Sequence, residues 1–327
     1  RQNVVDVIIP VYRPDEKLEK LIERLNQQTV EPAHIFFMQT MTEDEAEDTR
    51  VRKILEKSKH GTIVPIGKLE FDHGGTRNKG AQMSEAEFML FMTQDAVPED
   101  PVLIEKLLQA VQQKDTIAAA YGRQLPDDKV GVIETYARQL PKNDCHIVEQ
   151  YTRQFNYPEE SLIKGKEDLP RLGIKTYFCS NVCAMYRRDI YLKMGGFVTK
   201  TIFNEDMICA GTMIQKGYSV VYAADARVYH SHNYSGRQQF HRNFDLGVSQ
   251  AEHPEIFEGV PSEGEGIRLV KRSLGYLIRT GHFWLIPQLI WQSGMKYAGY
   301  FLGKRYRKLP RKVVLACTMS PYYWNRK

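Results

Sequence analysis

Residues 88–95 read Phe-Met-Leu-Phe-Met-Thr-Gln-Asp and decide the fold. Five uninterrupted apolar residues are typical of a strand that is buried on both faces, as in a sheet covered by helices. Asp95 closes the run directly before Ala96, Val97 and Pro98. The pattern therefore predicts a buried strand that delivers one carboxylate to the sheet edge where ligands of such folds bind.

Similar runs lie on both sides of this strand. Apolar and β-branched runs predict strands at residues 4–9, 35–38, 62–66, 117–121, 180–186, 218–222 and 226–230. Apolar spacing and capping signals predict helices at residues 14–25, 43–57, 205–216 and 238–250, with another opened by Pro101. Strands that alternate with helices predict an α/β fold, with a mostly parallel sheet between two helical layers.

Charge is unevenly distributed along the chain. The 327 residues include 45 Lys and Arg against 40 Asp and Glu, a net charge of +5. Residues 268–327 contain 13 of the 45 basic residues and no acidic one, which leaves 32 basic against 40 acidic residues elsewhere. A basic tail on an acidic body favours an anionic surface, with phospholipid as the first interpretation and nucleic acid as the second.

The tail is also apolar and aromatic. Leu274, Leu277 and Ile278 recur near helical spacing, and Trp284 and Trp291 flank a second apolar stretch. Trp prefers the membrane–water interface, and basic residues meet anionic head groups. We therefore expect one domain at residues 1–250 and a helical, amphipathic region at 251–327 that lies on the membrane without crossing it. The alternative is that this region packs on the first domain or on a second subunit of a homo-oligomer.

Five cysteines, an odd number, include no CxxC pair. Cys179 and Cys183 lie in an apolar stretch, so we expect core thiols in a reducing compartment. The sequence shows no signal-peptide pattern and no run of about 18 apolar residues. These features predict a cytoplasmic location, on the inner face of the plasma membrane.

Three short motifs carry candidate chemistry. Asn204 precedes Glu205 and Asp206 at the start of a predicted helix, where Asn suits an N-cap and the acids suit either the helix dipole or a general base. Residues 71–78 (FDHGGTRN) form a glycine-containing turn before a short helix, whose N–H groups suit an anion. His230 and His232 follow a strand on one side of it and, together with a lone carboxylate, suggest a metal site.

These residues, in this order, resemble the bacterial rhamnosyltransferase group of the family 2 glycosyltransferases, which have the GT-A fold. The resemblance covers residues 4–250. Its motifs are residues 71–78, 91–96 (FMTQDA), 121–126 (YGRQLP), 180–182 (SNV), 195–197 (GGF), 205–206 and 229–235 (YHSHNYS). It implies an inverting, metal-dependent transfer of L-rhamnose from dTDP-L-rhamnose to a lipid-linked glycan acceptor in surface polysaccharide synthesis.

The resemblance also implies roles for single residues. Donor binding falls to Pro10, Val11, Tyr12, Gln39, Asp72, Arg77, Asn78, Gln94 and Asp95. Gln39 stands where many relatives have an acid that contacts the nucleoside. Thr93-Gln94-Asp95 replaces the usual Asp-x-Asp, so Asp95 alone is carried over as the ligand of Mg²⁺ or Mn²⁺.

A second metal ligand and the catalytic groups follow from the same resemblance. His230 would complete the metal site, with His232 as the alternative. Asp206 matches the catalytic base, and Glu205 its acidic neighbour. Gln239, Arg242 and His232 would face the acceptor. Asn243 replaces the Trp of the QxxRW motif of processive members, so no long processive synthesis is expected.

Two other functions remain open at this point. One is a family 2 transferase that uses another nucleotide sugar. The other is a non-catalytic nucleotide-sugar-binding membrane scaffold, which the incomplete Asp-x-Asp favours and the retained Glu205, Asp206 and His230 oppose. In each case the partners expected are a nucleotide sugar and a membrane surface, with no nucleic acid.

Overall fold

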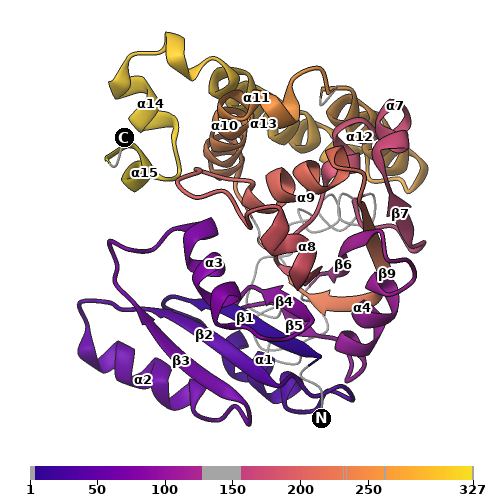
Figure 1. Ribbon diagram of the computed structural model, residues 1–327. Coiled ribbons are helices and arrows are strands. Elements are labelled where there is room, and N and C mark those ends of the chain that lie inside the picture. Colours follow the sequence, from indigo (N-terminus) through magenta and orange to yellow (C-terminus); the bar gives the residue numbers. More distant parts are fainter. Residues whose placement is uncertain (1–3, 127–155, 231, 233, 261–262, 326–327) are drawn as a thin grey trace.

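The structure is a computed structural model that describes residues 4–126, 156–230, 232, 234–260 and 263–325. Its centre is a nine-stranded sheet in the order β3-β2-β1-β4-β8-β6-β9-β5, with β7 beside β9 (Figure 1). The strands are β1 (Val5–Val11), β2 (His34–Thr40), β3 (Gly61–Ile66), β4 (Phe88–Met92), β5 (Val97–Pro98), β6 (Ile117–Leu125), β7 (Leu162–Lys164), β8 (Cys183–Arg187) and β9 (Ser219–Tyr229). As predicted, β4 is buried along its length, and it lies between β1 and β8.

The sheet is parallel in one half and mixed in the other. Strands β1 to β4 are parallel neighbours. Strand β8 runs antiparallel between β4 and β6, and Cys183 at its start pairs with Met92 at the end of β4. Strands β5 and β7 pair antiparallel with β9. The expected parallel arrangement therefore describes the first half, and the sheet as a whole is mixed.

Two predicted strands, 218–222 and 226–230, prove to be one. Strand β9 runs from Ser219 to Tyr229 without a break and pairs in parallel with β6. The pairing register shifts between Gly122 and Arg123 of β6, opposite the gap between the two predicted strands. The prediction of two strands was wrong, and the continuous strand carries its last residue to the site edge of the sheet.

Helices cover both faces of the sheet, giving the three layers that the alternating pattern predicts. Apolar residues of α1 (Lys17–Leu25), α2 (Glu45–Leu55) and α4 (Leu103–Val111) form one core cluster with the sheet. Residues of α3 (His73–Met83), α8 (Arg188–Lys193) and α9 (Glu205–Gln215) form the cluster on the other face. Strand alternation separates the two, since Val7 and Ile9 belong to the first cluster and Ile8 to the second.

Helix α3 begins earlier than predicted. Its first residue is His73, so Gly74 and Gly75 lie in the first turn rather than in a break before it. Asp72 caps the helix by accepting a 2.7 Å hydrogen bond from the Gly75 N–H. A side chain at Gly74 would place its Cβ 2.1 Å from the Val198 carbonyl oxygen. The glycine is therefore required by close packing against the loop before α9.

Helices α13 (Ile286–Lys304) and α14 (Arg311–Cys317) pack on α10 (Gly236–Glu252), at the top of the molecule in Figure 1. Helix α13 crosses α10 closely, since a Cβ at Gly299 or Gly303 would lie 2.2 or 2.1 Å from a carbonyl oxygen of α10. The other helical segments are η2 (Lys166–Asp168), α7 (Leu169–Leu172), η3 (Gly173–Tyr177), α11 (Pro254–Phe257), α12 (Glu263–Arg279), η4 (Phe283–Leu285), η5 (Tyr306–Lys308) and α15 (Pro321–Asn325).

Two expectations about the chain as a whole can be compared with the fold. Among the described residues, none of the helices combines the length and apolarity that a membrane crossing requires. Cys179 and Cys183 are buried free thiols, as expected, and so are Cys209 and Cys317. Cys145 lies outside the described residues.

Candidate active site

Three potential metal ligands meet beyond the end of β4. Asp95 follows β4, and His230 and His232 follow β9. The Nε2 atoms of His230 and His232 lie 3.6 and 3.4 Å from Oδ2 of Asp95. One ligand atom from each residue falls within 4.8 Å of the other two. The structure thus brings both histidines to Asp95.

The donor set fits a divalent ion. One carboxylate oxygen and two imidazole nitrogens suit a transition ion such as Mn²⁺ better than Mg²⁺, which prefers oxygen ligands. Burial of Asp95 acts to raise its pKa, but positive charge on His230 and His232 outweighs that effect and lowers the pKa. Asp95 is therefore ionised at neutral pH, as a ligand must be.

His230 is held in a defined orientation. Its Nδ1 lies 3.0 Å from Oε1 of Gln124, and Nε2 of Gln124 donates a 3.0 Å hydrogen bond to Oγ of Ser180. With the Gln124 oxygen as acceptor, Nδ1 of His230 carries the proton. Nε2 faces Asp95, where it would have to lie in order to bind a shared metal ion.

Glu205 and Asp206 form the second group of the site, in the first turn of α9. Asn204 precedes them in the left-handed conformation, with φ of 67°, which Asn tolerates better than most residues. Asn204 occupies the N-cap position of α9, as predicted, but its side chain makes no capping hydrogen bond. The left-handed residue instead turns the chain into the helix.

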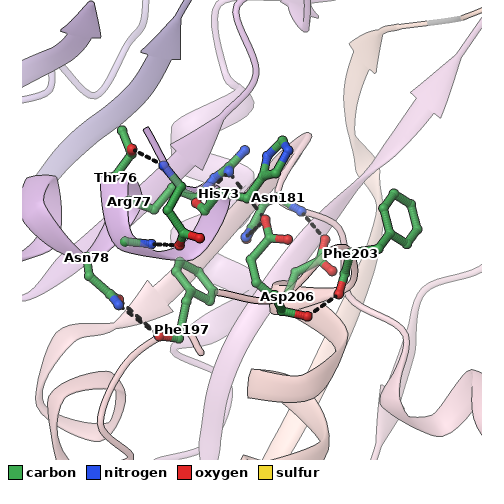
Figure 2. Close-up of polar contacts among 12 residues, drawn as sticks. His73, Thr76, Arg77, Asn78, Asn181, Phe197, Phe203 and Asp206 are labelled. Atoms are coloured by element: carbon green, nitrogen blue, oxygen red, sulfur yellow. Dashed lines mark hydrogen bonds and ion pairs between the residues drawn. The ribbon is translucent and has the colours of Figure 1, made fainter. Parts of the chain in front are cut away.

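Asn181, which leads into β8, contacts both acids. Its backbone N–H donates a 3.0 Å hydrogen bond to Oδ2 of Asp206, and its amide Nδ2 lies 3.5 Å from Oε1 of Glu205. The hydroxyl of Tyr186 donates to Oδ1 of Asn181 at 3.1 Å and fixes the amide. Figure 2 shows Asn181 and Asp206 pointing toward each other.

Neighbouring charges and burial shift the pKa values of Glu205 and Asp206 in opposite directions. Nη1 of Arg77 lies 3.3 Å from Oε1 of Glu205, and both side chains are almost fully buried. Burial acts to raise the pKa of Glu205, but Arg77 and then His73 outweigh it and lower the pKa. Burial and the Glu205 charge raise the pKa of Asp206 to about 7. Glu205 is thus the ionised partner, and Asp206 titrates in the range that suits a general base.

Two residues of the FDHGGTRN motif are occupied by protein contacts. Asp72 caps α3 and also accepts a 3.0 Å hydrogen bond from the Lys200 N–H. Asn78 bonds the carbonyl and the N–H of Phe197 at 2.8 and 2.9 Å, as Figure 2 shows. Both side chains therefore tie α3 to the loop before α9.

The remaining predicted donor-binding residues lie at the ends of β1, β2 and β4. Gln94 bonds the backbone of Tyr12 in both directions, at 2.8 and 3.0 Å. Val11 is buried in the core, so only its backbone faces the sheet edge. The preceding Pro10 is half-buried, at the end of the same strand. Gln39 is buried, and its amide donates to the Asp48 carbonyl at 3.2 Å.

Two of the three predicted acceptor residues, Gln239 and Arg242, lie on α10, whereas His232 precedes the helix and lies beside Asp95. The guanidinium of Arg242 lies over the ring of Phe203 at 4.7 Å and that of Tyr234 at 5.5 Å. Phe203 directly precedes Asn204, so Arg242 contacts the segment that leads into α9. Gln239 is half-buried, and its carbonyl accepts a 2.7 Å hydrogen bond from Asn243.

Comparisons with known proteins identify the family of the chain. The sequence profile described as glycosyl transferase family 2 matches residues 6–195. The chain belongs to glycosyltransferase family 2. It is 37% identical over 324 residues to the O-antigen chain rhamnosyltransferase WbaN of Salmonella anatum, covering 98% of this chain and 95% of that relative. It is 36% identical to RfbN of Salmonella typhimurium, which has the same description, covering 98% and 96%.

Solved structures support the fold of this family 2 glycosyltransferase. The mannosyltransferase PcManGT from Pyrobaculum calidifontis, solved with GDP-Man and Mn²⁺, matches with a TM-score of 0.54 at 15% identity, over 97% of this chain and 79% of that one. TarS 1–349 of S. aureus matches with a TM-score of 0.51 at 14% identity, over 93% and 91%. The expected GT-A fold is confirmed.

The glycosyltransferase site contains residues to which the sequence reasoning assigned no role. Gln124 and Asn181 contact His230 and the acidic pair, although both lie within motifs quoted for the family resemblance. Lys164 is buried beside Tyr121 and Phe178. A polar residue inside an apolar, strand-like stretch was the available signal for Asn181 and Lys164.

Proposed function

We propose that this enzyme transfers L-rhamnose from dTDP-L-rhamnose to a lipid-linked saccharide acceptor in the synthesis of an O-antigen-type surface polysaccharide. The observation that carries the proposal is the identity of 36–37% with two O-antigen chain rhamnosyltransferases over nearly the whole of each chain. Asp206, with a raised pKa beside an ionised Glu205, supports catalysis over the scaffold alternative.

Asp206 is the proposed general base. It accepts the proton of the acceptor hydroxyl while that oxygen attacks the anomeric carbon of the donor, and the nucleoside diphosphate leaves from the opposite face. One displacement inverts the anomeric configuration, and no covalent sugar–enzyme intermediate is required. The N–H groups of Asn181 and Met207 hold the two oxygens of Asp206 at 3.0 and 2.8 Å.

Asp95, His230 and His232 are the proposed ligands of Mn²⁺ or Mg²⁺. When bound, the ion supplies positive charge that neutralises the leaving diphosphate. The three residues hold its donor atoms close together at the end of β4, which supports this role. We propose that Pro10, Val11, Tyr12, Gln39 and Gln94 line the nucleoside, and that Asp72, Arg77 and Asn78 shape the phosphate side.

The acceptor is proposed to approach over α10. Arg242, placed beside Phe203 and Tyr234, and Gln239 would meet it, with His232 nearest the metal cluster. Trp291 lies against the start of α10, since a Cβ at Gly236 would lie 2.7 Å from its indole nitrogen. This position supports a nearby site for the lipid end of the acceptor. Gly236 begins α10, only four residues after His232.

A membrane surface is the proposed partner of residues 251–327. On α13, Ile290, Gly294, Tyr297, Phe301 and Lys304 are all exposed and follow helical spacing, so they form one stripe. We name it the α13 stripe. Trp284 and Trp291 are also more than half exposed. Exposed aromatic residues beside a purely basic tail fit anionic lipid on the cytoplasmic face.

One assay tests the function directly. The protein is incubated with a panel of dTDP-, UDP- and GDP-sugars, Mn²⁺ or Mg²⁺, and membranes that contain lipid-linked saccharides. We expect a mass increase of one deoxyhexose on the lipid-linked product only with dTDP-L-rhamnose, and an inverted linkage by NMR. Turnover of a different nucleotide sugar would show that the donor assignment is wrong while leaving the family intact.

A further inference from the structure

One short segment, residues 178–182, touches both halves of the candidate site. It leads from η3 into β8, and we name it the bridging segment. Its Ser180 and Val182 contact the surroundings of the metal cluster. Its Asn181, which lies between them, contacts Glu205 and Asp206. Asn181 and Val182 form a turn in which the Cys183 N–H donates a 3.2 Å hydrogen bond to the Ser180 carbonyl, and in this turn neighbouring residues contact different groups.

The contacts on the metal side reach two of the three ligands. Oγ of Ser180 accepts from Gln124, whose Oε1 lies 3.0 Å from Nδ1 of His230. The carbonyl of Val182 accepts a 3.2 Å hydrogen bond from the Thr93 N–H, two residues before Asp95. Gln124 is itself almost fully buried, so its amide has few other orientations available.

The contacts on the base side all pass through Asn181. It is buried, its amide oxygen accepts from Tyr186, and its amide nitrogen faces Glu205. Its backbone N–H donates to Asp206. A change in the position of Asn181 would therefore move both carboxylates relative to each other.

A buried lysine anchors the start of the segment. Nζ of Lys164 donates hydrogen bonds to the Phe178 carbonyl, to the Lys175 carbonyl at 3.1 Å and to the Tyr121 hydroxyl at 3.0 Å. It also lies 4.7 Å from the centre of the Tyr121 ring. Lys164 belongs to β7, so the segment is fixed to the sheet independently of either carboxylate.

We propose that the bridging segment holds the metal cluster and the acidic pair in register. Its own Asn181, and Gln124 of β6, which donates to its Ser180, are the positioning residues. Gln124 acts on His230, and Asn181 acts on Glu205 and Asp206. The inference rests on the proposed roles of Asp95 and Asp206 and is independent of which sugar is transferred.

The metal side is tested with Mn²⁺ alone, measured by electron paramagnetic resonance and calorimetry without donor. Gln124→Leu removes the acceptor from Nδ1 of His230 and should weaken Mn²⁺ binding about 10- to 100-fold. Gln124→Glu restores an acceptor at the same place and should recover most of the affinity. Gln113→Leu makes the same change at an exposed position and should bind Mn²⁺ as the wild type does.

The base side is tested by steady-state kinetics at saturating Mn²⁺. Asn181→Ala should lower kcat about 10-fold or more, with donor KM and Mn²⁺ affinity nearly unchanged, because it removes the amide that contacts Glu205 and Tyr186 and so frees the acidic pair to shift, while the metal ligands keep their contacts. Tyr186→Phe should lower kcat in the same sense by a smaller factor. Tyr222→Phe removes a buried hydroxyl that bonds the Pro158 carbonyl, and serves as the matched control.

Two results would overturn the proposal. The first is that Gln124→Leu binds Mn²⁺ with the affinity of the wild type, while Asp95→Ala no longer binds it. The second is an equal loss of kcat and Mn²⁺ affinity in Asn181→Ala together with a lowered melting temperature, which would indicate general loosening. If Asp95→Ala also binds Mn²⁺ normally, the assignment of the metal ligands is wrong, and with it the premise of the inference.

Discussion

Arg77 and Glu205 form a buried ion pair, with Nη1 3.3 Å from Oε1, directly beside Asp206. The pair joins α3 to the first turn of α9, two elements far apart in the sequence. The positive charge of Arg77 keeps Glu205 ionised. The negative charge of Glu205 in turn contributes to the raised pKa of Asp206. An ion pair in the interior thereby sets the proton affinity of its neighbour.

Glu205→Gln should lower the pKa of Asp206, because it removes the neighbouring negative charge. The acid limb of the kcat/KM profile, expected near pH 7 in the wild type, should move to lower pH. The measurement is a pH profile between about pH 5 and 9, taken at a temperature where the variant is folded. Glu255→Gln, at an exposed position, is the control; an unshifted limb in Glu205→Gln would mean that Glu205 does not tune the base.

Asp206→Asn should lower kcat strongly and leave donor binding nearly unchanged, because a base acts in the transition state. Asn keeps the shape of the side chain and removes its ability to accept a proton. Near-normal turnover would identify another group, with Glu205 the first candidate, as the base.

The same substitution should affect stability with a defined sign. The pKa of Asp206 is raised to about 7 from its ordinary value of 3.8, so between these values the folded state binds more protons than the unfolded state. The stability contribution of Asp206 is therefore present at low pH and lost as pH rises through about 7. Asp206→Asn should have a higher melting temperature than the wild type at pH 8, and the difference should shrink at pH 5. A constant difference across that range would contradict the raised pKa.

Asp95→Ala should abolish transfer and Mn²⁺ binding, because it removes the only carboxylate of the cluster. His230→Ala and His232→Ala should each reduce activity less completely, since two ligands remain. Calorimetry with Mn²⁺ and transfer assays check both effects. Full activity of any of these variants in the presence of chelator would exclude a metal role for the cluster.

Ile290→Glu should reduce binding to anionic vesicles, because it places a negative charge in the α13 stripe. Val313→Glu, on the partly exposed surface of α14, should float with vesicles nearly as the wild type does. Flotation with anionic and neutral lipid gives the comparison. If the wild type does not float and instead forms a salt-resistant dimer that Ile290→Glu dissociates, a second copy covers the stripe.

Two glycines of α13 should respond oppositely to alanine. Gly303→Ala would bring a Cβ to 2.1 Å from the Phe244 carbonyl oxygen and should destabilise the fold by about 1–3 kcal/mol. Gly294 has open space at that position, so Gly294→Ala should stabilise the helix by about 0.5–1 kcal/mol. Thermal unfolding of both variants checks the packing of α13 on α10; equal effects would argue against it.

Local sequence patterns allowed part of the site to be predicted. The apolar run at residues 88–92 placed Asp95 correctly at a strand end, and alternation placed His230 and His232 on one side of another. The contacts of Gln124 with Ser180 and of Asn181 with Asp206 join residues 56 and 25 positions apart. Nothing in the local spacing indicates such pairs, because they depend on β8 running antiparallel beside β4.

The start of α3 was predicted wrongly for a related reason. Two glycines usually mark a break, but Gly74 lies in the helix because the Val198 carbonyl occupies the space of a side chain. That neighbour is 124 residues away. The left-handed Asn204 is similar, since its backbone conformation, rather than its side chain, begins α9.

The close crossing of α10 and α13 bears on how this enzyme is recombined with its relatives. Residue 250 lies in the last part of α10, whose carbonyl groups have Gly299 and Gly303 as close neighbours. In a chimaera joined after α10, helix α10 of one parent would pack against the glycine face of α13 from the other parent, and the two surfaces would not be matched. A junction at Ser235, before the helix, keeps both crossing helices from one parent and exchanges them as one unit.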